Sequence, residues 1–285
     1  MISSRELLLG VLAPALIALV VMLIAGRPWS SRSPRGAWGG AVALAAAYIA
    51  AHIGLFGPPQ FRPAPVESWL IWITLGGMII GLIETASRGP WWGRLLWRAA
   101  AAAGSVWLIV RLKAMNGQWT GTEAAGWTVG LSICTIAFWA LCDALAQRIE
   151  KQGGGAGAAL VLSGVTGLGA ALIVLDGQTL VVGQFAGALA MALLACAAVA
   201  WWKPRATIGR GGVAVVALLA PMLWLDAWMW AELHWEYAAL LAASPALAFA
   251  GDLPWIARRP GWVRTLARVA AVAIPLLALV GVEVK

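Results

Sequence analysis

Long apolar segments separated by short polar connections fill this chain from end to end. Ten such segments are present, and most are close to the roughly 20 residues that an α-helix needs to cross a bilayer. They cover residues 6–26, 37–56, 68–85, 97–115, 124–146, 157–175, 179–202, 212–231, 237–251 and 265–282. The runs lack the strict alternation of barrel strands, so helices are the expected spanning element. The sequence predicts an all-α, polytopic transmembrane helical bundle of about ten spans, with residues 1–285 as one transmembrane domain.

The composition is typical of a protein dissolved in lipid. Of the 285 residues, 62% are hydrophobic and 11% are charged, and the mean hydropathy is +0.85. A water-soluble domain carries about 25% charged residues, so this chain has too little polar surface to stay in water. Little sequence remains for a soluble module, and no nucleotide-binding, nucleophile-elbow or zinc-protease motif is present. We therefore expect no enzyme activity, no catalytic residues, no metal and no cofactor.

Small residues and cysteines fit the same interpretation. Glycine spacings such as Gly77/Gly81 allow helices to approach closely in lipid. The cysteines Cys134, Cys142 and Cys196 all lie in apolar segments and form no CxxC pair, so we interpret them as small buried side chains.

The positive charges indicate the orientation of the chain. Only Arg5, Arg62, Arg111, Lys113 and Lys285 lie on one side of the predicted bundle, and the other Lys and Arg residues fall in every second connection. Cytoplasmic loops carry the excess of Lys and Arg, so both termini are predicted to face the outside of a bacterial inner membrane. The basic rim would contact anionic lipid at the cytoplasmic face. This distribution explains the formal charge of +8 without a nucleic-acid partner.

An internal repeat is indicated by residues 88–101 and 258–271, which share eight identities at a constant offset of 170. Because the two segments lead into spans four and ten, residues 1–115 and 179–285 are predicted to be parallel repeats around a central hairpin at 124–175. The alternative is that both loops use the same residue types independently to anchor the membrane rim. Under either interpretation the expected cytoplasmic anchoring residues are Arg88, Trp92, Arg94, Arg98, Arg258, Trp262, Arg264 and Arg268.

Polar side chains in the spans are the next candidates for function, because ionisable groups are costly in lipid. No acidic, basic or histidine side chain lies at the centre of a predicted span. The richest polar segment is 224–237, at the outer end of span eight, and it is faintly similar to the tryptophan-rich segment of cytochrome c haem-handling proteins, although their WGxxWxWD pattern is absent. An aromatic belt with solvated acids is the simpler interpretation, and a cation or haem site is the alternative. The candidate outer-rim site comprises His52, Asp226, Glu232, His234 and Glu236.

Prolines and hydroxyls near the span centres form a second candidate site. Ser132, Thr135, Pro221, Ser244 and Pro245 could line an interior cavity, because proline frees backbone carbonyls in membrane helices; the simpler interpretation is that the prolines only bend their helices.

Two functional hypotheses follow from these features. The first is a non-catalytic structural or accessory subunit, with membrane-protein partners or self-association, which the absence of midplane charge favours. The alternative is a transporter or permease for a neutral or weakly polar solute, which requires a polar cavity at the second candidate site. A haem- or metal-handling protein is the minor alternative.

Overall fold

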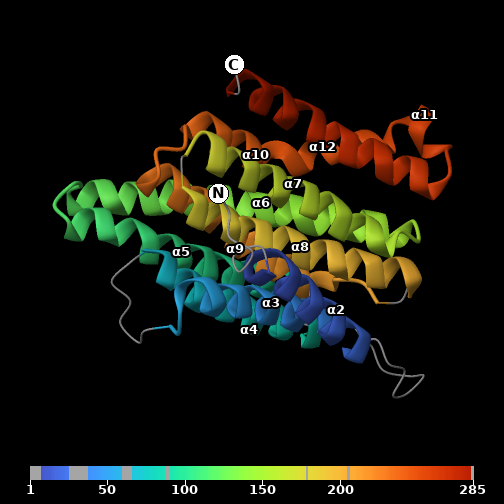
Figure 1. Cartoon of the computed structure of the whole chain (residues 1–285), viewed down its shortest axis with the longest axis horizontal. Helices are drawn as coiled ribbons and strands as arrows, with labels where there is room; N and C mark the ends of the chain where they lie inside the picture. The colour runs from blue at the N-terminus through green and yellow to red at the C-terminus, as the bar shows by residue number, and fades with distance from the viewer. Residues whose placement is uncertain are drawn as a thin grey trace.

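The computed structural model describes residues 8–25, 38–59, 66–87, 90–177, 179–203 and 206–283, and these form a bundle of helices (Figure 1). The long helices are α2 (Ala13–Ala25, preceded by the π-helical turn Leu8–Leu12), α3 (Gly39–Phe56), α4 (Trp69–Ala86, preceded by η2, Val66–Ser68), α5 (Trp91–Met115), α6 (Gly121–Lys151), α7 (Gly155–Leu175), α8 (Leu180–Trp202), α9 (Gly209–Trp230) and α12 (Gly261–Glu283). Shorter elements are α10 (Trp235–Leu247), η3 (Ala248–Asp252) and α11 (Pro254–Ala257).

The predicted all-α, polytopic fold is confirmed. Nine helical stretches of the described chain are long and apolar enough to cross a membrane. The ninth predicted segment, 237–251, corresponds to α10 and η3, and it is the exception because its α-helix has only 13 residues. Pro245 cannot donate a backbone hydrogen bond to Leu241, and the hydroxyl of Ser244 donates to that carbonyl instead, at 2.8 Å. The chain then tightens into the 3₁₀ turn η3.

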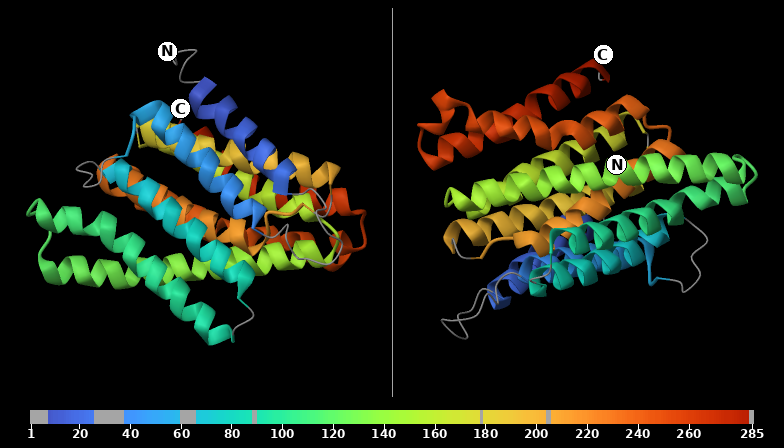
Figure 2. Two further views of the ribbon diagram at one scale, coloured as in Figure 1. Left: turned by 90° about the horizontal axis from the view of Figure 1, so that it is seen from below. Right: turned by 180° about the vertical axis from the view of Figure 1, so that it is seen from behind.

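Helix α9 is the centre of the bundle. In its most apolar stretch of 18 residues, 89% are buried inside the protein, which is the largest share among the candidate spans. Its main neighbours are α4, α3 and α6, while α7 and α8 form the closest helix pair. Figure 2 shows that α12 lies at the edge of the bundle, and that the α5–α6 connection projects beyond the other helices. Side chains on α9 are therefore surrounded by protein rather than by lipid.

Glycine allows α4 to approach α9 closely. Gly77 and Gly81 both face α9, as their spacing predicts. A Cβ atom built on Gly81 would lie only 2.6 Å from the carbonyl oxygen of Gly211, which is closer than real Cβ contacts. Only glycine fits at this crossing without moving the backbone.

Two helices begin earlier than predicted. Helix α5 starts at Trp91 rather than 97, and α12 starts at Gly261 rather than 265. Each follows a proline, Pro90 or Pro260, and Pro90 is the N-cap residue of α5 with an extended backbone, so the helix begins directly after it. Their arginines therefore belong to helices and not to connections.

Candidate functional site

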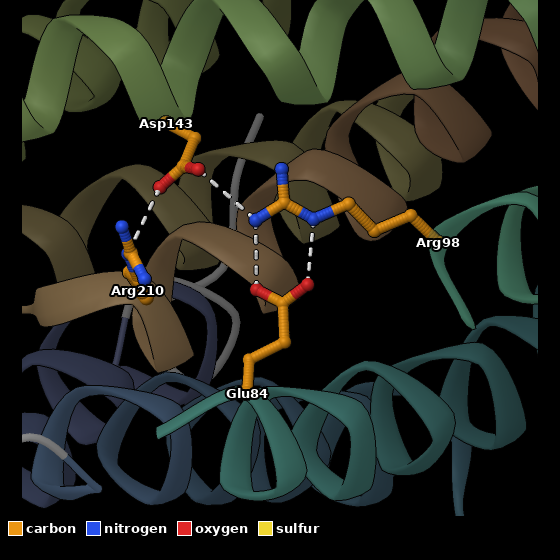
Figure 3. Close-up of polar contacts among 4 residues, drawn as sticks. All are labelled: Glu84, Arg98, Asp143 and Arg210. Atoms are coloured by element: carbon orange, nitrogen blue, oxygen red, sulfur yellow. Dashed lines mark hydrogen bonds and ion pairs between the residues drawn. The ribbon is translucent and has the colours of Figure 1, made fainter. Parts of the chain in front are cut away.

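Four charged side chains meet near one end of the bundle (Figure 3). Arg98 on α5 makes a two-pronged contact with Glu84 in the last turn of α4, from Nε to Oε1 at 2.6 Å and from Nη2 to Oε2 at 2.9 Å. The same Nη2 donates to Oδ2 of Asp143 on α6 at 3.0 Å. Arg210 at the start of α9 forms an ion pair with Asp143 at 3.8 Å. Two carboxylates and two guanidinium groups thus connect four helices with no net charge.

Burial makes this cluster energetically significant. The side chain of Glu84 is 2% exposed, and those of Arg98 and Asp143 are 12% exposed. The guanidinium of Arg98 also lies 5.0 Å from the ring centroid of Trp139, a cation–π contact. A buried charge is tolerated only when it is paired and hydrogen-bonded, and the fork of an arginine satisfies a carboxylate in this way. Removing one member would leave uncompensated charge inside the protein.

A second cluster of the same kind connects α6, η3 and α12. Arg268, which is 2% exposed, donates from Nη2 to Oδ1 of Asp252 and to Oε1 of Gln152, both at 2.8 Å. Gln152 in turn donates to Asp252 at 3.1 Å. Arg148 pairs with the other carboxylate oxygen of Asp252 at 2.7 Å. The end of α6 thus contacts both clusters, and we call the end of the bundle that contains them the arginine-rich end.

The structure assigns different roles to the predicted anchoring residues. Arg98 and Arg268 are equivalent at the offset of 170. Arg268 is buried, Arg98 is largely covered, and both guanidinium groups are engaged by carboxylates, so the prediction of surface anchoring is wrong for them. Trp92 and Trp262 remain 57% and 59% exposed, which suits a place at the membrane surface. Arg258 is exposed, Arg94 and Arg264 are partly buried, and Arg88 lies outside the described residues.

An apolar groove occupies the region of the predicted polar cavity. Its volume is about 520 Å³, and its walls come from α6, α9 and α10. Thr135 and Pro221 line it, whereas Ser132, Ser244 and Pro245 do not. Most lining side chains are apolar, among them Trp127, Leu131, Phe138, Leu225, Trp228 and Ala239.

The hydroxyls of this region are directed elsewhere. Those of Ser132, Thr135 and Ser244 donate to backbone carbonyls of their own helices, at 2.5, 2.9 and 2.8 Å. A serine or threonine bonded in this way presents little polarity to a neighbouring space. The five candidates therefore do not form one polar cavity.

The five residues of the predicted outer-rim site are also separated. His52 and Asp226 are each 1% exposed and lie inside the bundle, so the expectation of a solvated rim acid is wrong for Asp226. His234 is exposed, and its Nδ1 lies 2.8 Å from Oδ1 of Asp176 at the end of α7. Glu232 and Glu236 are exposed. No group of three or more potential metal-ligating His, Cys, Asp or Glu side chains occurs within the described ranges.

Sequence reasoning did not identify three partners of these residues. Asp176 holds His234, and the backbone carbonyl of Glu67 lies 3.1 Å from Nε2 of His52. Tyr48 is buried and interacts electrostatically with Asp226. The sequence did contain a signal for Tyr48, because it lies four residues before the candidate His52 and therefore shares one face of α3 with it.

The nine long apolar helices of the described chain define the class of protein: a multi-pass α-helical membrane protein. Comparisons with known protein families, with curated proteins and with solved structures gave no match. Functional conclusions therefore rest on the chain's own residues.

Proposed function

We propose that this chain is a non-catalytic structural or accessory subunit of a membrane-protein assembly. The observation that supports this function is the apolar character of the groove at Thr135 and Pro221, where a carrier for a polar solute would need a polar cavity. The nearby hydroxyls are bonded to their own backbones. A polar solute would find few partners here, whereas apolar surface suits contact with lipid or with another membrane protein.

The two ion-pair clusters support a rigid rather than an alternating bundle. They connect α4 with α5, α6 and α9, and they connect α6 with η3 and α12. A carrier that alternates between two states must move groups of helices relative to each other. Buried ion pairs that cross between these helices would oppose such movement.

We place the chain in a bacterial inner membrane, with the arginine-rich end in the cytoplasm and both termini outside, because cytoplasmic loops carry the excess of Lys and Arg. We also propose that residues 1–115 and 179–285 are parallel repeats around the hairpin 124–175. Arg98 pairs with an acid at the end of α4, and the equivalent Arg268 pairs with one in η3 after α10. Contacts shared by equivalent residues support common descent more strongly than shared loop composition.

Site-specific photo-crosslinking in native membranes tests the subunit proposal. A photoreactive amino acid replaces Ala239 in the groove or Ile79, an exposed residue of α4, one position at a time. We expect at least one position to give a single protein adduct of defined mass, and the same protein to co-purify stoichiometrically in mild detergent. The other position serves as the matched control for random collision in the bilayer.

Other results of these experiments would contradict the subunit proposal. If both positions, and further exposed positions on α2 and α12, give adducts only with lipid, and the purified protein is a monomer without partners, then the subunit proposal is wrong. Uptake of a solute by vesicles that contain only this protein would favour the carrier instead.

A further inference from the structure

Asp226 is an exception among the buried acids of this protein. It lies on α9, four residues before the helix ends, and its residue exposure is 1%. Glu84, Asp143 and Asp252 are each held by arginine. Asp226 forms no ion pair with any described residue, and its Oδ2 has no hydrogen-bond partner there. This buried acid therefore has no paired cation within the described ranges.

Two buried polar side chains on α3, Tyr48 and His52, are also incompletely bonded. Tyr48 is 0% exposed, its hydroxyl has no partner among described residues, and it interacts electrostatically with Asp226. His52 is 1% exposed and uses Nε2 toward the carbonyl of Glu67, while its Nδ1 has no described partner. Glu67 in η2 is half-buried and interacts electrostatically with Asp226. Tyr48 and Glu67 are therefore the electrostatic neighbours of Asp226, and Glu67 is the more exposed acid of the two.

The cations nearest to this end of the bundle have other contacts. On α5, the guanidinium of Arg111 lies 4.4 Å from the ring of Trp69, and the ammonium of Lys113 lies 4.4 Å from that of Trp230. Neither forms an ion pair with Asp226 within the described part of the chain.

Two acids at this end of the bundle have partners of their own. Glu123 at the start of α6 caps its own helix by accepting from Thr120. Asp176 on α7 is held by His234, the residue before α10. No described group thus supplies the positive charge that the carboxylate requires.

An unpaired carboxylate in a protein interior carries a penalty of several kcal/mol. A multivalent metal does not fit, because calcium needs about six to eight oxygen ligands and the described residues contain no cluster of three potential ligands. A proton requires neither a cavity nor further ligands. We propose that Asp226 is a proton-binding site that exchanges its proton with the aqueous phase at the end of the bundle opposite the arginine-rich end, with Tyr48 and Glu67 as its electrostatic neighbours.

The proposal goes beyond the subunit function and does not depend on it. If the folded protein keeps a proton on Asp226 that the unfolded chain releases, unfolding liberates that proton. Stability must then fall as the pH rises through the range in which the unfolded acid is already ionised. The site thus couples the packing of α9 to the pH of one aqueous compartment.

Infrared spectroscopy of the full-length protein in lipid vesicles tests the site directly. At neutral pH we expect the C=O stretching band of a protonated carboxylic acid, shifted in heavy water, and lost in Asp226→Asn. Glu236→Gln is the matched control because Glu236 is exposed at the same end of the bundle, and it should keep the band unchanged. Labelling aspartate carboxyl carbons with ¹³C in the unsubstituted protein should shift the band, which provides an answer even if Asp226→Asn does not fold.

Three results would overturn the proposal. The first is the absence of the band at neutral pH, and the second is a band that persists in folded Asp226→Asn or does not respond to aspartate labelling. The third is a band that is absent in sodium buffer and grows when choline replaces sodium, because a sodium ion would then be the resident ligand. None of these results depends on whether the chain has a protein partner.

Discussion

We expect the replacement of Arg98 with methionine to lower the free energy of unfolding by about 3–5 kcal/mol, the usual effect of removing one partner from a buried ion pair. Methionine keeps an apolar stem of similar length but leaves the carboxylates of Glu84 and Asp143 without the group that bonds to both. With Glu84 only 2% exposed, water cannot replace the lost hydrogen bonds. Equilibrium unfolding in mixed micelles, followed by tryptophan fluorescence, measures the change.

Arg94 provides the matched control one helical turn earlier. Arg94→Met removes the same charge, and no ion pair of Arg94 occurs among the described residues, so its effect should stay within about 0.5 kcal/mol. The triple variant Glu84→Gln, Arg98→Met, Asp143→Asn should recover much of the lost stability, because neutral replacements remove the unpaired charge together with its partner. Equal losses in Arg98→Met and Arg94→Met would show that the buried cluster contributes nothing specific.

The spans were predictable from sequence, but the contacts of their polar residues were not. Hydropathy located the helices because a helix that crosses a bilayer needs a continuous apolar stretch of about 20 residues. The predicted spans 97–115 and 265–282 contain Arg98 and Arg268, but the count of positive charges grouped both with the connections, because an arginine near a span end looks the same in sequence whether it faces water or a buried carboxylate. Their partners are 14 and 16 residues away in sequence and lie on other helices, so only tertiary packing could reveal them. The offset of 170 did single out both arginines before their contacts were known.

The interpretation of the tryptophan-rich segment failed for a different reason. Residues 224–237 look like an aromatic belt, and Trp235 is indeed 60% exposed. However, α9 is the central helix, so Trp224 is 2% exposed and packs against Phe138 with ring centroids 5.3 Å apart. Asp226, two residues further, is buried with it. Which helix occupies the centre of a bundle is decided by the packing of all the others, and local composition does not encode it.

The second large effect is expected for a substitution at Gly81, where the backbones of α4 and α9 are in close contact. In Gly81→Val, the new side chain would enter the space occupied by the backbone of Gly211, and neither backbone can yield as a flexible side chain could. Overpacking of this kind costs typically about 1–3 kcal/mol, occasionally more. We expect a loss near the upper end, about 3 kcal/mol, because α4 would have to separate from the central helix along much of its length. The same micelle unfolding assay measures it.

Gly76 on the same helix separates this clash from ordinary helix propensity. A Cβ atom on Gly76 meets nothing within 4 Å, whereas one on Gly81 meets backbone at 2.6 Å. Alanine raises the helix propensity at both positions by about 1 kcal/mol relative to glycine, so Gly76→Ala should be neutral or stabilising while Gly81→Ala destabilises. The difference between the two alanine variants therefore isolates the α4–α9 contact. If both variants unfold at the same denaturant concentration, α4 does not depend on glycine to pack against α9.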